Sequence, residues 1–299
     1  MCGNWRRFIA KLSILIVNYK TADFLERCLL SARKFYDDAD LEICVIDNAS
    51  GDGSGERIRR EFPSVQWIQN EINRGFAAAL NQGLKATSSP YVLWLNPDSE
   101  FLDAGLLGLI DYLKQHPETA ILGPQILNPD QSIQLSARSF PSYQTAVFNR
   151  YSLVTKLFPG NPVSRRYLRL DLERSQIHEV DWVSGACLLH RREVLEKIGA
   201  LDENFFMYCE DVDFCFRAKK AGWKVQYHPG AKVLHHIGGS SRFRRRGMIA
   251  QHHRSMWLYY KKNFSRNILQ DAVVGVAILA RCLFLVILPV RKGAAKVDK

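Results

Sequence analysis

Acidic residues are almost absent from the last fifth of the chain. Residues 242–299 contain 13 lysines and arginines but only two acids, Asp271 and Asp298, whereas residues 1–241 contain 28 basic and 28 acidic residues. The whole net charge of +11 therefore belongs to the C-terminal segment. Such an imbalance predicts an anionic partner. No nucleic-acid-binding motif accompanies the charge, so we expect a membrane surface and no nucleic acid.

The sequence also lacks paired cysteine spacings, and we expect no secretory signal. The seven cysteines are odd in number and show no C-x-x-C spacing, which argues against disulfides and a zinc site and favours reduced thiols. The first apolar run begins at Leu12, is short, and is followed by Asn18 and Lys20, so it is not typical of a signal peptide. We therefore expect a cytoplasmic protein, peripheral at the inner face of the plasma membrane.

Only one apolar run approaches membrane-spanning length. Residues 272–290 form this run, but Arg281 interrupts it, and a charge at the bilayer centre costs about 2.5–3.5 kcal/mol on insertion scales. We predict a helix that lies at the membrane interface, within a basic and partly apolar C-terminal helical segment, residues 242–299. The alternative is a helix packed on the preceding domain or in a homodimer interface.

Strand and helix patterns alternate through residues 1–241. Apolar runs such as 12–17 and 91–95 are typical of strands that are buried on both faces of a parallel sheet. Asp23 and Glu26 predict a capping box for the first helix. The sequence thus predicts an α/β domain with a mostly parallel central sheet flanked by helices. The other expected strands are 43–46, 65–68, 180–189 and 223–227, and the helices are 23–36, 56–61, 75–86, 102–115, 192–198 and 211–221.

The periodicity weakens between residues 128 and 179. Prolines and a group of arginines replace the regular pattern in this part of the chain. We predict an irregular insertion, which either lies beside a substrate or is a solvated connection.

Acidic side chains follow the predicted strands at several places. Asp47 follows one apolar run, Asp98 follows another through Asn96, and Glu210 with Asp211 opens a predicted helix. In an open α/β sheet the ligand crevice lies at the carboxyl ends of the strands. Separate carboxylates there suit a metal-bound phosphate and a general base, and we interpret them as the site of an enzyme that acts on a nucleotide-sugar.

The order and spacing of the motifs resemble the family 2 inverting glycosyltransferases. Within that family the chain is most similar to bacterial rhamnosyltransferases that build lipid-linked surface polysaccharides. The resemblance covers about residues 12–241 and implies a GT-A fold, a single nucleotide-binding α/β domain. It rests on the segments 13–19, 45–52, 73–81, 95–98, 185–187, 206–213, 221–223 and 235–240.

The resemblance implies a nucleotide-sugar site at the carboxyl ends of the first strands. In this family the residue at Asp47 contacts the pyrimidine or its ribose, although the glycine-rich turn after it also explains an aspartate that only caps the turn. The binding residues implied are Asn18, Tyr19, Asp47, Asn73, Gly75, Asn96 and Asp98.

A metal site is implied at Asn96-Pro97-Asp98. These residues stand where the family has an Asp-x-Asp motif, which binds a divalent cation on the donor diphosphate. Asp98 is the expected ligand for Mg²⁺ or Mn²⁺, with Glu100 as a helper, while Asn96 leaves strict metal dependence open. His235, next to His236, matches a further metal ligand or phosphate contact, and residues 238–241 could present backbone N–H groups. A structural histidine is the equal alternative.

Asp211 matches the general base of the family. It would take the proton of the acceptor hydroxyl as the nucleotide diphosphate leaves from the opposite face. Glu210 beside it would raise its proton affinity, whereas a helix N-terminus would lower it. The alternative is that both acids only complement the helix dipole.

Together these features predict transfer of L-rhamnose from dTDP-L-rhamnose to a lipid-linked saccharide. A UDP-hexose, UDP-GlcNAc or UDP-galactofuranose donor is the closest alternative, and a catalytically silent sugar-binding or scaffold protein is an alternative of another class. A nucleotidyltransferase is disfavoured because the loop after the first strand, residues 18–22, contains no glycine.

Overall fold

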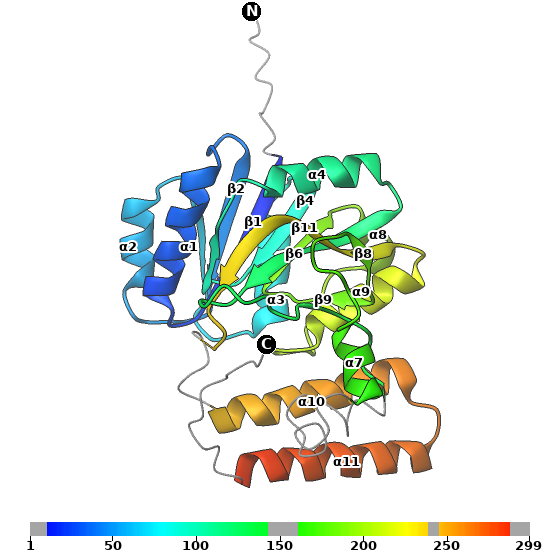
Figure 1. Ribbon diagram of the computed structural model, residues 1–299. Helices are drawn as coiled ribbons and strands as arrows, with labels where there is room; N and C mark the ends of the chain where they lie inside the picture. Colours follow the sequence, from blue (N-terminus) through cyan, green and yellow to red (C-terminus); the bar gives the residue numbers. More distant parts are fainter. Residues whose placement is uncertain (1–10, 143–160, 239–244, 288–299) are drawn as a thin grey trace, which may run out of the picture.

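The computed structural model describes residues 11–142, 161–238 and 245–287. It consists of an α/β domain with a helical hairpin beneath it (Figure 1). The strands are β1 (Leu12–Asn18), β2 (Leu41–Asp47), β3 (Gln66–Gln69), β4 (Tyr91–Leu95), β5 (Ser99–Phe101), β6 (Thr119–Leu127), β7 (Ala137–Arg138), β8 (His178–Glu179), β9 (Trp182–Val183), β10 (Cys187–Arg191) and β11 (Lys224–His235). The helices are α1 (Ala22–Phe35), α2 (Ser54–Glu61), α3 (Phe76–Ala86), α4 (Leu106–Gln115), α7 (Pro162–Leu168), α8 (Val194–Ile198), α9 (Glu210–Lys220), α10 (Arg245–Phe264) and α11 (Ile268–Ile287).

The central sheet is mixed but mostly parallel, as the sequence predicts. Its order is β3-β2-β1-β4-β10-β6-β11-β5, and β8 pairs with β11. Strands β3, β2, β1 and β4 are parallel, and so are β6 and β11. Strand β10 is antiparallel to both of its neighbours, β4 and β6.

Helices cover both faces of the sheet and enclose two hydrophobic cores. One core joins the strands to α3 and α9, and the other joins them to α1, α2 and α4. Every residue of β1 and β4 is buried, which explains why these strands are continuous apolar runs rather than alternating ones. The expected doubly covered α/β domain is therefore confirmed.

Several local expectations are wrong. Thr21 precedes α1 without a side-chain cap bond, and Asp23 instead pairs with Arg57 at 3.1 Å, so the predicted capping box is absent. The helix expected over 102–115 begins only at Leu106, because β5 and a turn take up the residues before it. Strand β6 was not anticipated. The irregular segment 128–179 contains β7, α7 and β8 among its described residues.

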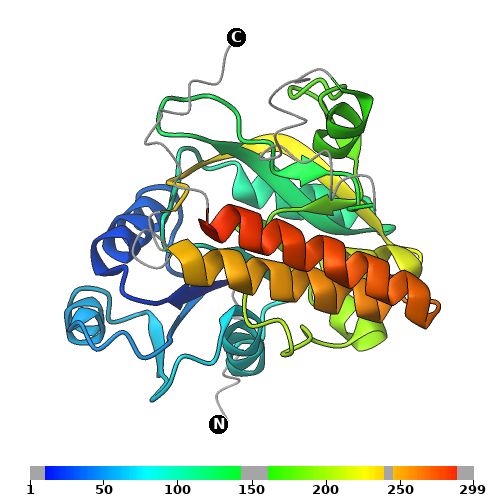
Figure 2. The same cartoon turned by 90° about the horizontal axis from the view of Figure 1, so that it is seen from below.

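The C-terminal helices form a separate layer. Helices α10 and α11 pack against each other, and α10 contacts the α/β domain through the buried side chain of Tyr259 and a bond of 2.8 Å from the Ser255 hydroxyl to the Met207 carbonyl. Figure 2 shows the hairpin lying across one end of the domain. Helix α11 has no buried residue, and it is the one helix in the described part of the chain with the length and composition to span a membrane.

Candidate functional site

The carboxyl ends of β1 and β2 form one part of the site. Asn18 and Asp47 end these parallel strands in the same register, and the Asn18 amide donates to the Asp47 carboxylate at 2.6 Å. Asp47 also accepts from the backbone and hydroxyl of Ser50 and from the side chain of Gln69. A carboxylate has about four acceptor positions. Asp47 therefore organises the turn after β2, and Gln69 is its one exposed partner.

A close backbone contact shapes the loop before α3. The Asn73 side chain accepts a bond of 2.9 Å from the Gly75 N–H, and Gly75 has a φ of +86°. A Cβ at Gly75 would lie 2.5 Å from the carbonyl oxygen of Phe206, which also accepts the N–H of Phe76. Glycine is required here both by its left-handed backbone and by this contact. Asn73 and Gly75 thus hold the segment that leads into α9.

Asn96, Asp98 and His235 come together beyond the end of β4. The His235 Nε2 lies 3.4 Å from the Asp98 carboxylate and 3.3 Å from the Asn96 amide. On the other side of the ring, Nδ1 lies 3.0 Å from the Oε1 of Gln134, whose own amide donates to the His235 carbonyl. Because Oε1 can only accept, Nδ1 carries the proton. In the neutral ring Nε2 is then a lone-pair nitrogen that faces Asn96 and Asp98.

This cluster fits a divalent cation that is completed by ligands from outside the protein. No group of three histidine, cysteine or acidic residues with metal-site geometry occurs in the parts of the chain that the structure describes. Asp98 and His235 nevertheless supply a carboxylate and an oriented imidazole, and the Asn96 amide could add an oxygen, a donor set that suits Mn²⁺. Glu100 is not part of the cluster, since it pairs with His236 at 3.2 Å and with Arg27 at 3.7 Å.

Asp211 is held at the start of α9 by two backbone groups. Its carboxylate accepts the N–H of Gly185 at 2.9 Å and the N–H of Val212 at 2.8 Å. Tyr208 and Cys209, the two residues that precede Glu210 at the start of α9, have φ values of 70° and 66°. Left-handed backbone is strained in residues that carry a Cβ, and such strain often accompanies functional sites.

The two adjacent acids have different protonation behaviour. Burial and the charge of Asp211 raise the pKa of Glu210 well above its ordinary range. Burial also raises the pKa of Asp211, but the N–H groups of Gly185 and Val212 stabilise its charged form and oppose that rise. Asp211 is therefore the member of the pair that ionises first, which is the state required of a base.

The bend between β9 and β10 links Asp211 to the Asn96–Asp98 cluster. Gly185 donates to the Asp211 carboxylate, and the carbonyl of the next residue, Ala186, accepts the backbone N–H of Asn96 at 2.9 Å. Two consecutive residues thus hold both parts of the site. Sequence reasoning placed Gly185 in a motif but did not anticipate that it would connect them.

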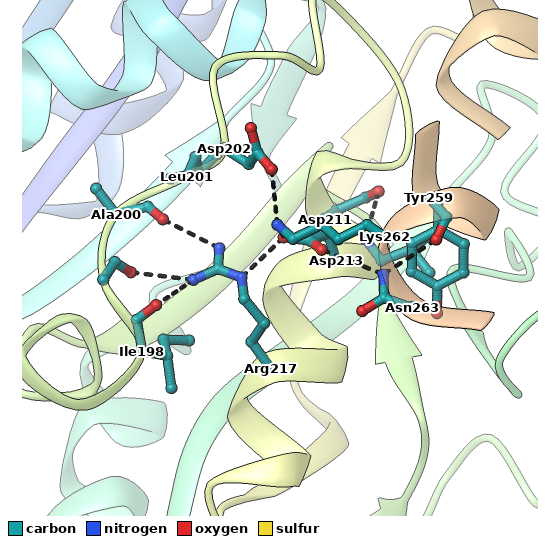
Figure 3. Close-up of polar contacts among 12 residues, drawn as sticks. Ile198, Ala200, Leu201, Asp202, Asp211, Asp213, Arg217, Tyr259, Lys262 and Asn263 are labelled. Atoms are coloured by element: carbon teal, nitrogen blue, oxygen red, sulfur yellow. Dashed lines mark hydrogen bonds and ion pairs between the residues drawn. The ribbon is translucent and has the colours of Figure 1, made fainter. Parts of the chain in front are cut away.

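A network of charges joins α9 to α10 (Figure 3). Asp213 is fully buried and pairs with Arg217 at 2.8 Å and with Lys262 of α10 at 3.0 Å. Lys262 also pairs with Asp202 at 2.7 Å, and Arg217 donates to the backbone carbonyls that precede Asp202. The sequence analysis missed this network. Only the i, i+4 spacing of Asp213 and Arg217 on a predicted helix could have indicated part of it.

The predicted site residues thus form three groups rather than a single cluster. Asn18 and Asp47 form the first group, Asn96, Asp98 and His235 the second, and Glu210 with Asp211 the third. Tyr19 follows β1 and is partly exposed. Gly75 lies against Phe206 in the segment that precedes Glu210, and Asn73 bonds to Gly75. Of the proposed phosphate-binding residues 238–241, only Gly238 lies within the described part of the chain.

Two family models match the sequence. The Glycosyl transferase family 2 model matches residues 13–199, and the Glycosyl transferase family group 2 model matches residues 133–291. The first match contains strands β2 to β10 with nearly all of β1, the acids after β2 and β4, and the bend at Gly185, but not β11. The second extends through the hairpin.

Several characterised proteins are similar over most of the chain. An N-acetylglucosaminyl-diphospho-decaprenol L-rhamnosyltransferase of Mycobacterium tuberculosis is 31% identical and is matched over 83% of both chains. The rhamnosyltransferase WbbL of Escherichia coli is 24% identical, over 77% of this chain and 84% of its own. The low-salt glycan biosynthesis hexosyltransferase Agl10 of Haloferax volcanii is 25% identical, over 89% of this chain and 81% of its own.

Solved structures share the fold. The mannosyltransferase PcManGT of Pyrobaculum calidifontis, in complex with GDP-Man and Mn²⁺, has a TM-score of 0.58 at 14% identity and covers 94% of this chain and 73% of its own. GalNAc-T7 with UDP, GalNAc and Mn²⁺ has a TM-score of 0.58 at 16% identity. That match covers 77% of this chain but 44% of GalNAc-T7. The expected GT-A fold is therefore confirmed.

Proposed function

Since this chain belongs to glycosyl transferase family 2 and is a glycosyltransferase, we propose that it transfers L-rhamnose from dTDP-L-rhamnose to a lipid-linked saccharide with inversion. Asp211 is the proposed general base. The observation that carries the proposal is the bend at Gly185-Ala186, which holds the Asp211 carboxylate and the backbone of Asn96 at once. A base and a diphosphate site must be fixed relative to each other for an in-line displacement, and this bend provides such a link.

The donor lies at the carboxyl ends of β1, β2 and β4 in this proposal. Asn18 and Asp47 face the nucleoside, and Gln69 is the partner of Asp47 that a nucleobase or ribose would displace. Tyr19 flanks the nucleotide, and Asn73 with Gly75 borders it.

Asp98 and His235, with Asn96, would hold the divalent cation that accompanies the donor diphosphate. When bound, the cation neutralises the charge that develops on the leaving diphosphate. The structure supports this assignment with the lone-pair orientation of His235 Nε2, which Gln134 fixes. Mg²⁺ and Mn²⁺ both remain in the proposal, and the nitrogen ligand favours Mn²⁺.

Asp211 removes the proton from the attacking acceptor hydroxyl. The N–H groups of Gly185 and Val212 orient its carboxylate and keep it ionised, while Glu210 holds its own proton more tightly. The proton passes to Asp211 as the new glycosidic bond forms and the bond to the nucleotide diphosphate breaks. A base near the operating pH is effective in this role.

The identity of the sugar and of the acceptor comes from the named relatives. The mycobacterial relative is named for rhamnosyl transfer to a diphospho-decaprenol-linked N-acetylglucosamine, and WbbL is also named as a rhamnosyltransferase. A lipid-linked acceptor fits a chain whose residues 242–299 carry all of its net positive charge. We therefore propose a peripheral enzyme at the inner face of the plasma membrane.

A donor panel tests the proposal. Purified full-length protein is incubated with Mn²⁺ or Mg²⁺ and, in separate reactions, dTDP-L-rhamnose, UDP-glucose, UDP-GlcNAc and UDP-galactofuranose, and the released nucleotide is measured. The proposal expects release of dTDP alone, with EDTA abolishing it. Release of UDP would replace the donor by the alternative, and no release from any donor, even with a diphospho-lipid acceptor, would favour a silent sugar-binding protein.

A further inference from the structure

The surface of α11 that points away from α10 is entirely apolar. Its large side chains have between 43% and 83% of their area exposed, and no polar or charged residue lies among them. This outer face of α11 consists of Ile268, Leu269, Ala272, Val273, Val276, Ala277, Leu279, Ala280, Leu283, Phe284 and Ile287.

The two charged residues of α11 are on its other side. Asp271 accepts from the hydroxyl of Tyr260 at 2.8 Å and pairs with Lys261, both on α10. Arg281 contacts the sulfur of Met256, also on α10, at 3.2 Å. The guanidinium that seemed to oppose membrane contact is therefore directed toward the neighbouring helix, and the outer face of α11 is uninterrupted.

The charge of the hairpin identifies the partner. Residues 245–287 contain seven lysines and arginines and one acid, and that acid, Asp271, is already paired. Arg254 of α10 is exposed, and so is Arg266 in the turn between the helices. An apolar helix face bordered by unbalanced basic charge matches a lipid monolayer with anionic head groups, which supplies both hydrocarbon and negative charge.

We propose that α11 lies flat in the cytoplasm-facing monolayer, with its outer face in the acyl-chain region and α10 between the lipid and the catalytic domain. The proposal rests on the membrane location proposed above and specifies how it is achieved. It assigns α11 as an in-plane anchor, although its length would also allow it to cross the bilayer.

The packing of α10 argues against a spanning arrangement. The two helices lie side by side along their lengths in both views (Figures 1 and 2), and α10 is fixed to the domain by Tyr259, Ser255 and Lys262. Turning α11 across the membrane would either carry the charges of α10 into the hydrocarbon or separate the helices. Both outcomes cost free energy, because the hydrocarbon offers no water or hydrogen-bond partner to charged groups or to polar groups whose contacts are broken.

The flat arrangement also orients the active site. In Figure 1 the carboxyl ends of β1, β2 and β4 are on the side of the domain that faces the hairpin. Helix α10 contacts the segment just before the acids, through the Ser255 bond to Met207 and the ring contact of His252 with Tyr208. The base would then be separated from the lipid by one helix layer, about 10 Å, within reach of a sugar carried on a membrane diphosphate.

Vesicle flotation tests the surface. Full-length protein is mixed with vesicles of phosphatidylcholine alone or with 30% phosphatidylglycerol, and the bound fraction is measured. The wild type is expected to float with the anionic vesicles, and Val276→Glu with Leu283→Glu is expected to reduce binding at least tenfold. Leu30→Glu, on the exposed surface of α1, introduces the same kind of change elsewhere and should bind as the wild type. Undiminished flotation of the double variant would overturn the proposal.

Depth measurements separate a flat helix from a spanning one. A fluorophore is attached to single cysteines at Leu269, Ala280 and Ile287, in a background with accessible native cysteines replaced by serine, and is quenched by lipids brominated at different depths. A flat helix gives the same shallow depth at all three positions. A maximum depth at Ala280 with shallow ends would overturn the flat arrangement.

A second copy of the chain is the competing occupant of the outer face. Light scattering in lipid-free buffer that shows a dimer, lost in the Val276→Glu, Leu283→Glu variant, together with absent flotation, would overturn lipid binding. Neither flotation nor quenching requires turnover. Failure of the donor panel would therefore leave the anchor standing, and failure of the anchor would leave the proposed reaction standing.

Discussion

At the scale of single residues, Glu210 and Asp211 differ in how their surroundings treat a negative charge. Two backbone N–H groups stabilise the Asp211 carboxylate, whereas Glu210 is buried beside that charge. The fold therefore stabilises the charged form of Asp211, which can act as a base, and destabilises the charged form of Glu210.

This arrangement predicts a pH-dependent gain of stability on removing Glu210. The pKa of Glu210 is higher in the folded state than the ordinary 4.5. Below about pH 4.5 the group is protonated in both the folded and the unfolded chain, and the stability is greatest. As the pH rises toward the folded-state pKa, the group ionises in the unfolded chain only, and the folded state loses stability. Glu210→Gln avoids that loss, and each unit of pKa separation is worth about 1.4 kcal/mol. Thermal unfolding should give a higher Tm than the wild type at pH 8 and an equal one near pH 4. A Tm difference that does not change with pH would contradict the assignment.

The positions of the candidate residues in the fold were predictable where a motif places them at a strand end or a helix start. Asn18 and Asp47 end strands as expected, and Asp98 lies near His235. Their roles remain proposals. Contacts between distant segments were not predictable. The Asp213–Lys262 pair joins residues 49 positions apart, and no local pattern reports such a contact.

At the scale of elements, the loop before α3 and the loop before α9 depend on each other. Gly75 and Phe206 are in van der Waals contact through their backbones, and the first turn of α3 donates to the Phe206 carbonyl.

Substituting Gly75 should therefore disturb both loops. Gly75→Ala adds a Cβ at 2.5 Å from the Phe206 oxygen on a left-handed backbone, and we expect a loss of about 2–4 kcal/mol in the free energy of unfolding. Gly108→Ala in α4 is the matched control. Nothing lies within 4 Å of its added Cβ, and helix propensity predicts a gain of about 0.5–1 kcal/mol. Urea denaturation measures both, and similar values for the two variants would refute this account of the loop contact.

Lys262 provides a test of the connection between α10 and α9. Lys262→Met removes one of the two cations paired with Asp213 and leaves Arg217 and the longer bond of 3.5 Å from Asn263. We therefore expect α9 to be held less firmly and kcat to fall about tenfold with little change in the donor KM. Lys261→Met is the control, because Lys261 pairs with Asp271 of α11 and does not contact α9. Lys262→Arg should recover most of the activity. Steady-state kinetics in which the Lys261 and Lys262 variants behave alike would rule out the positioning role.

Helices and strands were predicted well where a regular apolar pattern extends over many residues. They were predicted poorly where contacts with distant segments determine the local structure. The strands at 12–17 and 91–95 and the helix at 211–221 were found within a few residues. Strand β5 has only three residues, and its pairing with β11 depends on a segment more than 100 residues away. The antiparallel direction of β10 could not be inferred either, because strand composition does not report the direction of pairing.

At the scale of the whole molecule, α10 lies between α11 and the α/β domain. It packs against α11 and also contacts the domain through Tyr259 and Lys262. We therefore expect α10 to contribute to the stability of the domain, although the excess positive charge begins near residue 242.

Truncation tests the contribution of α10. A chain that ends at residue 241 exposes the surface that Tyr259 covers and leaves Asp213 without Lys262, so we expect it to aggregate or to unfold at a markedly lower temperature. A chain that ends at residue 266 keeps α10 and loses only the exposed α11, and it should remain soluble with nearly the Tm of the full-length protein. Equal stability of the two truncated chains would show that α10 contributes nothing to the fold.

The transfer reaction with a lipid-linked acceptor is the most direct test of the whole account. Full-length protein, Mn²⁺, dTDP-L-rhamnose and a short-chain N-acetylglucosaminyl-diphospho-lipid are incubated, and the glycolipid is identified by mass spectrometry for the wild type and for Asp211→Asn. The account predicts addition of one rhamnose by the wild type and a loss of at least a thousandfold in rate for Asp211→Asn, which remains folded and still binds donor. Undiminished transfer by Asp211→Asn, or no rhamnosylated product from the wild type, would contradict it.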